Sequence, residues 1–417
     1  AKFGPSAYLW IVFGCIFAGA THDYLSGMIS MRKGGVGLHE VIGETLGDKT
    51  RKLMLVFSVV LLTMVGAVFV YSPAEILDDM AGTTTMWIII IFAYYFIATM
   101  LPVDKVIGRI YPIFAFSLLF MAGALMVVLF LKWPSVPELW DGLGNKALTV
   151  DSSWSSQLYP CLFITIACGA ISGFHATQSP LMGRCIKSER MGRPIFYGAM
   201  ITEGVVALIW ATVASYFFYA EPQPGYQVIT EFANNGFSTS APKVVNIICN
   251  DWLGVAGGIL AMLGVVAAPI TSGDTALRSA RLIIADFIRI EQRTIKRRLL
   301  ISVPLFLCCI ALLLWQVENP DGFNVIWQYF GWSNQTLSVF TLWAITVYLL
   351  QNGKPYYFML IPALFMTTIC ATYLFVSKQA FGMPERVGYL LGVVVLIVAY
   401  GWFHIYESKY KKNNKIS

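Results

Sequence analysis

Five ionisable side chains lie inside apolar stretches of this 417-residue chain: His22, Asp23, His175, Glu203 and Asp274. An ionisable group is costly in hydrocarbon, so a membrane segment that keeps one generally uses it. The imidazole of histidine titrates near physiological pH, and carboxylates bind protons or hard cations. These residue types therefore predict the handling of protons, cations or a small anionic molecule.

The stretch Leu162–Pro180 begins as an apolar helix and then loses helix propensity. Gly169, Ser172 and Gly173 fall near its middle, and His175 follows directly. A break in a membrane helix leaves backbone N–H and C=O groups unpaired, and in transporters such breaks mark substrate sites. We therefore expect these four residues to bind substrate, with His175 at the anionic end. The alternative for His175 is a buried ring bonded to a backbone carbonyl.

His22, Asp23 and Glu203 are weaker candidates. Because His22 and Asp23 are neighbours on a helix, their side chains are expected to point in different directions and not to form a dyad. Asp23 is expected to pair with a cytoplasmic arginine or to cap a helix, and a proton relay is the alternative. Glu203 follows Arg190 and Arg193, so an ion pair or snorkelling is favoured over proton coupling. A metal site built from His22, Asp23 and His175 has no spacing signal.

Polar residues also interrupt a later apolar segment. Thr271, Ser272 and Asp274 lie where this segment reaches its inner end, and oxygen ligands suit Na⁺. We expect these three residues to serve a coupling ion. The alternative for the hydroxyls is packing between helices, and for Asp274 it is an ion pair with Arg278, four residues on.

Asn334 and Gln335 form a polar interruption in another apolar segment, FGWSNQTLS. We place Asn334 with the substrate-binding candidates. The nearby aromatic residues Trp327, Tyr329 and Trp332 suit either the wall of a binding cavity or an interfacial belt.

The composition places these residues in a membrane protein. The chain is 57% hydrophobic and 12% charged, whereas a soluble domain carries roughly 25% charge. The basic residues lie in short loops, where they set topology rather than bind nucleic acid. The eight cysteines form no C-x-x-C pair and are expected to be reduced core residues. Phosphate loops and hydrolase motifs are absent from the sequence, so no cofactor is expected and an enzyme is not predicted.

The hydropathy pattern predicts eleven apolar helices and three further helical pieces. An amphipathic helix is expected within 34–48, a short helix near Lys243–Cys249 in the polar connection 221–251, and a helical continuation over 277–295. The eleven segments cover 5–31, 53–72, 84–101, 111–132, 156–180, 195–219, 252–276, 299–316, 324–350, 356–376 and 386–407.

Lysine and arginine positions predict the orientation of these helices. If the first segment ends in the cytoplasm, 23 of the 29 Lys and Arg residues fall in cytoplasmic loops. The C-terminus is then cytoplasmic and Ala1 lies outside. An outside start with an odd number of helices suggests that one helix precedes the chain; a natural outside N-terminus is the alternative.

Counting the first segment as the second helix of a fold places the break at 169–175 in helix six. This layout predicts an all-α, LeuT-like core of five plus five inverted helices in a single transmembrane domain, 1–417. In this scheme 5–132 is the remainder of the first repeat, 156–350 is the second repeat, and 356–407 adds two helices. The first core helix, the symmetry partner of helix six, is expected to be missing.

Four segments resemble the carbon starvation protein A family of peptide and pyruvate transporters. They are WIVFGCIFAGATHDYLSGM (10–28), LFITIACGAISGFHA (162–176), SGDTALRSARLIIAD (272–286) and IWQYFGWSNQTL (326–337). The resemblance covers essentially the whole chain. It implies a LeuT-like importer of pyruvate or short peptides in the bacterial inner membrane, active under nutrient limitation and coupled to a cation.

From the residues and the resemblance together we expect a secondary importer of small carboxylates or peptides, coupled to H⁺ or Na⁺. A nutrient sensor of the same fold with little transport is the alternative, and a passive channel is a third. The expected partners are the small substrate and membrane lipid, with no nucleic acid. The sequence leaves the oligomeric state open.

Overall fold

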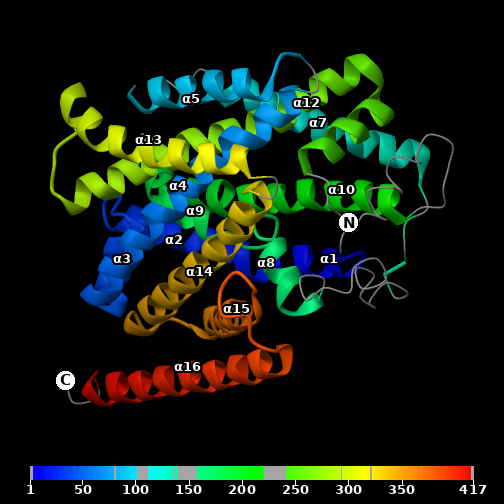
Figure 1. Ribbon diagram of the computed structural model, residues 1–417. Coiled ribbons are helices and arrows are strands. Elements are labelled where there is room, and N and C mark those ends of the chain that lie inside the picture. Colours follow the sequence, from blue (N-terminus) through cyan, green and yellow to red (C-terminus); the bar gives the residue numbers. More distant parts are fainter. Residues whose placement is uncertain are drawn as a thin grey trace. The chain divides into compact units, whose positions relative to one another are not determined.

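The computed structural model describes residues 3–78, 81–100, 111–134, 136, 138–139, 157–219, 241–292, 294–319 and 322–414. Residues 221–240 of the predicted polar connection therefore lie outside the described residues. The described elements are helices, and Figure 1 labels those that are α-helices. Each of the eleven predicted apolar segments is helical over most of its length, which confirms the all-α fold class.

Several of the helices are interrupted. The N-terminal half contains α1 (Ser6–Leu9), η1 (Trp10–Gly19), α2 (Ala20–Arg32), α3 (Leu38–Leu46), α4 (Asp48–Asp78), α5 (Thr84–Met100), α7 (Tyr111–Lys132), η4 (Leu158–Leu162), α8 (Phe163–Thr165) and α9 (Gly173–Cys185). The C-terminal half contains η5 (Glu189–Met191), η6 (Arg193–Tyr197), α10 (Gly198–Tyr219), α12 (Ala241–Phe287), α13 (Ile295–Glu318), α14 (Gly322–Gln351), α15 (Tyr357–Val376) and α16 (Glu385–Asn414).

Six described helices are long and apolar enough to cross a membrane by length and composition. Together with the fold, they establish a multi-pass membrane protein, whereas the count of eleven crossings stays a prediction. The six are Asp48–Asp78, Tyr111–Lys132, Glu189–Tyr216, Ile295–Glu318, Tyr357–Val376 and Glu385–Asn413.

The chain forms two compact units. The first comprises Ser58–Glu138 and Ile209–Phe330, and the second comprises Lys2–Phe57, Leu139–Leu208 and Gly331–Ser417. The expectation of one transmembrane domain stays a prediction.

The first unit is organised around α12, which packs on α5, α7 and α13. Tyr95 of α5 places its hydroxyl 2.7 Å from the carbonyl oxygen of Phe69 and 3.1 Å from that of Pro269, so it ties α5 to α4 and α12. Gly66 of α4 leaves room for Leu277 of α12, because a Cβ there would lie 2.7 Å from the leucine side chain. Small residues thus allow these helices to pack closely.

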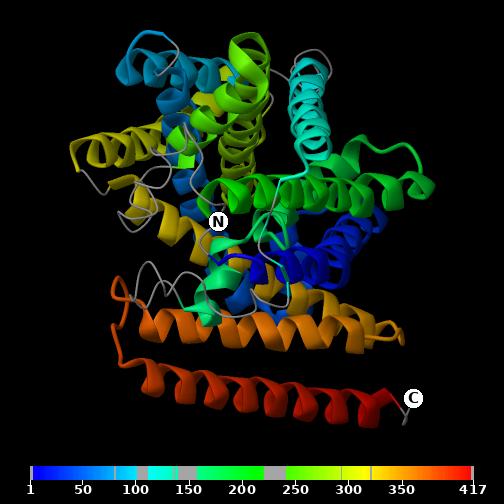
Figure 2. The same cartoon turned by 90° about the vertical axis from the view of Figure 1, so that its right-hand side faces the viewer.

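In the second unit, α2 packs on α9, α3 and the π-helical turn η6, while α15 packs on α16 and on the segments around η4. Figure 2 shows α15 and α16 running side by side, in orange and red. The first helix is α-helical at both ends, but Trp10–Gly19 is π-helical. Long π-helical stretches are rare and commonly accompany functional sites. The predicted amphipathic helix within 34–48 is confirmed as α3.

Gly254 divides α12 into a short helix and a long one. Its φ of 66° and ψ of −177° lie in a region that is essentially restricted to glycine. The short helix predicted near Lys243–Cys249 is thus confirmed. The predicted continuation to 295 is wrong beyond Phe287, because the chain turns there and Arg289 takes a positive φ of 55°.

Replacing Gly254 with alanine should lower the free energy of unfolding by about 1–3 kcal/mol, since a Cβ strains this backbone conformation. Thermal unfolding in detergent measures the effect. Gly123→Ala is the matched control, because a Cβ at this helical glycine meets open space. Equal melting temperatures for the two variants would contradict the prediction.

Candidate functional site

The helix predicted to break does so in the second unit. The short helix α8 ends at Thr165, and α9 begins at Gly173. Ile166 has a ψ of 80°, and Ser172 has an extended backbone with a φ of −130°. The break is therefore confirmed, and it starts three residues before the Gly169 at which the sequence placed it. Gly169 and Ser172 lie within this non-helical segment, and Gly173 and His175 open α9.

Two adjacent side chains of α14 satisfy the two ends of the break. The Asn334 Oδ1 accepts the backbone N–H of Phe174 at 2.7 Å and the hydroxyl of Ser172 at 3.2 Å. The Gln335 Nε2 donates to the carbonyl oxygen of Phe163 at 2.8 Å. Asn334 thus caps the start of α9, and Gln335 caps the end of α8. The polar interruption of α14 is the partner of the break.

One donor at the break has no protein partner. The Nδ2 of Asn334 is buried and makes no hydrogen bond to the described residues. A buried amide without a partner is costly, so such a group is suited to a bound molecule or water. Asn334 therefore combines a structural contact through its oxygen with a free donor on its nitrogen.

His175 lies between two carboxylates. Its Nδ1 is 2.8 Å from the Oδ2 of Asp23 on α2, and its Nε2 is 3.3 Å from the Oε2 of Glu203 on α10. The other oxygen of Asp23, Oδ1, is 2.8 Å from the Nδ1 of His22. Four titratable side chains are therefore connected in one series, which we call the His–carboxylate cluster: His22, Asp23, His175 and Glu203.

Burial increases along this cluster. The Glu203 side chain is 39% exposed, that of His175 is 21% exposed, that of Asp23 is 8% exposed, and that of His22 is fully buried. The Nε2 of His22 is buried without a hydrogen-bond partner among the described residues. The cluster therefore extends from a partly accessible carboxylate to a fully enclosed histidine.

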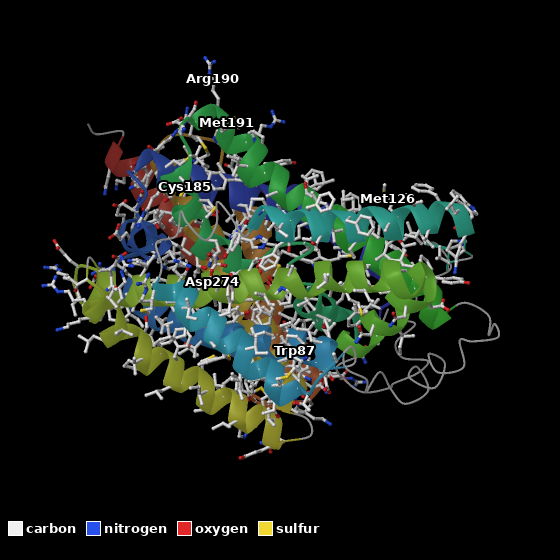
Figure 3. All side chains as sticks on the ribbon, turned by 90° about the horizontal axis from the view of Figure 1, so that it is seen from above. Trp87, Met126, Cys185, Arg190, Met191 and Asp274 are labelled. Atoms are coloured by element: carbon white, nitrogen blue, oxygen red, sulfur yellow. The ribbon has the colours of Figure 1, made fainter. Side chains whose placement is uncertain are left out.

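Three expectations about these residues are wrong. His22 and Asp23 do form a pair, because the short aspartate side chain folds back to its neighbour's ring. Asp23 binds two histidines instead of a cytoplasmic arginine. Glu203 pairs with His175 instead of Arg190 or Arg193; in Figure 3 the Arg190 side chain extends away from the ribbon. The spacing of residues along a helix predicts which side chains are neighbours on that helix. It does not predict their partners on other helices.

The first unit contains a second buried charge site. The Nη2 of Arg278 lies 3.1 Å from the Oδ1 of Asp274, and both side chains are at most 1% exposed. The Oδ2 of Asp274 accepts the hydroxyl of Tyr111 at 3.1 Å. Arg278 also donates to the carbonyl oxygen of Ala98 at 2.8 Å. Figure 3 labels Asp274 on α12. The ion pair anticipated between Asp274 and Arg278 is present.

The hydroxyl of Thr271 is bonded within its own helix, to the carbonyl oxygens of Ala267 and Ala268 at 3.1 and 2.9 Å. Its carbonyl accepts Thr275 at 2.8 Å. The neighbouring Ser272 carbonyl also accepts Thr275, at 3.0 Å. A coupling-ion role for Thr271, Ser272 and Asp274 stays a prediction. Among the described residues, no group of three or more His, Cys, Asp or Glu is arranged to hold a metal ion.

The aromatic residues around Asn334 contact different partners. Trp327 stacks on Phe323 with ring centroids 5.6 Å apart, in the first unit. Trp332, in the second unit, donates its indole N–H to the carbonyl oxygen of Cys370 at 3.0 Å. Each is anchored by packing in its own unit.

Sequence reasoning missed Trp10 and Tyr111. The indole N–H of Trp10 donates to the carbonyl oxygen of Ile166 at 2.9 Å and so pairs one carbonyl of the break. Tyr111 binds Asp274. Trp10 and Tyr111 both belong to apolar segments. The N–H or O–H group of an aromatic side chain does not distinguish it there from the apolar residues around it in the sequence.

Over the described residues, a helical chain with a broken, capped helix and a partly buried histidine between two carboxylates has the architecture of a polytopic membrane transporter. A solved structure of a mutant of the Eremococcus coleocola manganese transporter shares this fold, with a TM-score of 0.56 at 12% identity over 98% of this chain and 92% of that one. The chain belongs to the carbon starvation protein CstA family, whose model matches residues 3–81, 70–235 and 229–373.

An uncharacterized membrane protein of Haemophilus influenzae is 41% identical over 54% of this chain and 73% of the relative. Other relatives are named as transporters and not as enzymes. The peptide transporter CstA of Bacillus subtilis is 26% identical over 99% of this chain and 84% of the relative. The pyruvate/proton symporter BtsT of Escherichia coli is 26% identical over 50% of this chain and 37% of the relative. The chain is thus a membrane transporter of the CstA family.

Proposed function

We propose that this protein is a secondary-active importer of short peptides or pyruvate-like carboxylates, driven by a cation gradient and used when nutrients are limiting. The observation that carries the proposal is the capped break between α8 and α9, with the free Nδ2 of Asn334 at one end. The names of the relatives support both substrate classes, since one is a peptide transporter and another is a pyruvate/proton symporter.

Substrate binding is assigned to the break. Gly169, Ser172 and Gly173 supply backbone groups, Asn334 supplies its amide N–H, and His175 faces the anionic end of the substrate. A helix N-terminus favours negative charge, and α9 begins at this point. The carboxylate shared by pyruvate and peptides is the group that such a site would recognise.

A LeuT-like arrangement of five plus five inverted helices is the architecture proposed for this importer. Counting the first helix as number two makes α4 and α5 numbers three and four, and α12 and α13 numbers eight and nine. An inverted five-helix repeat equates three with eight and four with nine. All four helices contribute to the first unit, as expected if symmetry-related helices share a structural role.

The proposed location is the bacterial inner membrane, with lipid around the apolar helices and the C-terminus in the cytoplasm. The support is the loop charge bias, in which 23 of 29 Lys and Arg residues fall on one side.

Replacing His175 with alanine should lower uptake about 10- to 100-fold, because the hydrogen bonds of its ring to Asp23 and Glu203, beside the proposed substrate site, are removed. The measurement is uptake of labelled pyruvate and labelled dipeptides into proteoliposomes, with imposed pH or Na⁺ gradients. His404→Ala on α16 is the matched control, since its side chain is 65% exposed. Intact uptake of every substrate by His175→Ala would disprove the site. Binding without uptake by the unmodified protein would favour a nutrient sensor.

A further inference from the structure

We infer that the coupling ion is a proton and that His175 carries it as a bridge between Asp23 of α2 and Glu203 of α10. The inference rests on the proposed transport function. It adds the identity of the ion, the residue that holds it, and the structural event that its release causes.

The bridge depends on the protonation of the ring. A neutral imidazole has one N–H donor and one acceptor, whereas the protonated ring donates from both nitrogens. His175 faces a carboxylate oxygen at each nitrogen, 2.8 Å from Asp23 and 3.3 Å from Glu203. Both contacts are hydrogen bonds to ionised carboxylates only when the ring holds two protons. Loss of one proton therefore breaks one of the two bridges.

The longer contact is the one expected to break. With a single proton on Nδ1, the ring keeps its bond to Asp23, and the lone pair of Nε2 faces the carboxylate of Glu203. Because two hydrogen-bond acceptors then face each other with no proton between them, this contact is unfavourable, so α9 is released from α10 and stays held to α2. Proton binding and release thus determine which helices His175 joins, which is what coupling to a conformational change requires.

His22 acts as a positioning residue for Asp23. Its Nδ1–H donates to the Oδ1 of Asp23, and its buried Nε2 is left as an acceptor without a partner. The Oδ2 of Asp23 is thereby directed at His175. Among the described residues, the carboxylates of Asp23 and Glu203 also act on two thiols, those of Cys15 on η1 and Cys168 in the break.

The same contacts argue against sodium at this position. Sodium needs several oxygen ligands, and each oxygen of Asp23 already faces a histidine nitrogen. With both carboxylates ionised, Asp23, His175 and Glu203 carry a net charge of −2 when the ring is neutral and −1 when it is protonated, so proton binding halves the negative charge without a coordination cage.

A polar route leads from the cluster along α2. Ser26 and Ser30 follow Asp23 at intervals of three and four residues, so they share its face of the helix. The Ser26 hydroxyl lies 3.4 Å from that of Ser179, whose hydroxyl donates to the carbonyl oxygen of His175 at 3.0 Å. Ser26 and Ser30 also line a small, mostly apolar cavity with Thr341 of α14 and residues of α3.

Two assays in proteoliposomes separate this inference from transport itself. Counterflow of labelled pyruvate or a labelled dipeptide at equal pH needs transport but no coupling. Accumulation under an imposed pH gradient needs both, and a matched Na⁺ gradient at constant pH tests the other cation. We expect counterflow with at least one probe, accumulation with the pH gradient only, and a vesicle dye that reports proton entry together with substrate.

Glu203→Gln should lower the ratio of proton-driven accumulation to counterflow about tenfold, and Glu203→Asp should restore part of it. Glu189→Gln is the matched control, because Glu189 is exposed and pairs with Arg32 at the surface. Accumulation driven by Na⁺, or an unchanged ratio in Glu203→Gln, would overturn the inference while transport stands. Absence of counterflow with both probes in the unmodified protein would overturn the proposed function. Proton entry is measured with the unmodified protein, so the identity of the coupling ion is tested even if a variant fails to fold.

Discussion

Replacing Arg278 with methionine should lower the free energy of unfolding by about 3–5 kcal/mol, the cost of leaving one member of a buried ion pair without its partner. Asp274 and Arg278 are both at most 1% exposed, so water cannot replace the lost guanidinium. The substitution also removes the donor to the carbonyl oxygen of Ala98 near the end of α5. Thermal unfolding in detergent measures the loss.

A double substitution separates the ion pair from the packing. Asp274→Leu combined with Arg278→Met removes both charges and should recover much of the lost stability, because well-packed apolar residues replace buried ion pairs at little cost. Arg32→Ala is the surface control, since its partner Glu189 is 54% exposed and such pairs contribute less than about 1 kcal/mol. A double variant as unstable as Arg278→Met would show that the charges are not the cause.

Gly173→Ala should abolish transport and lower the free energy of unfolding by about 1–3 kcal/mol, through overpacking at the start of α9. An added Cβ would collide with the carbonyl oxygen of Asn334 and lie 2.5 Å from the backbone nitrogen of Ser338. Backbone atoms of α14 cannot move aside as a flexible side chain would. The start of α9 must therefore shift, and with it the bonds from Phe174 and Ser172 to Asn334.

Uptake in proteoliposomes and melting temperature together test this substitution. Gly401→Ala in α16 is the matched control, because a Cβ there has no neighbour within 4 Å. Unchanged uptake in Gly173→Ala would mean that the close approach of α9 to α14 is not needed for function.

Much of the helical architecture could be predicted from the sequence. Apolar runs of about membrane length located the helices, and Gly169, Ser172 and Gly173 located the break, because glycine and serine lower helix propensity. The short helix before Gly254 was also predicted from its polar flanks. These features depend on local sequence, so no knowledge of tertiary contacts was needed.

The partners of the charged residues could not be predicted. Asp23 and His175 are 152 positions apart, and Ser172 and Asn334 are 162 apart, so no periodicity relates them. The expected pairs of Asp23 and Glu203 with arginines followed from nearness in sequence. The structure pairs them with His175 instead, because α9 restarts between α2 and α10. Gln335 drew attention as a polar interruption, yet its bond to Phe163 depends on tertiary packing.

The π-helical stretch Trp10–Gly19 determines the direction in which each later side chain of the same helix points. One residue more or less per turn rotates the downstream helix by about 100° around its axis. Asp23 lies four residues after this stretch, and its carboxylate contacts His175 only at the present rotation of the helix about its axis. The backbone hydrogen-bond pattern of the ten residues Trp10–Gly19 therefore sets the direction of the Asp23 carboxylate, and a change in that pattern would rotate Asp23 away from His175.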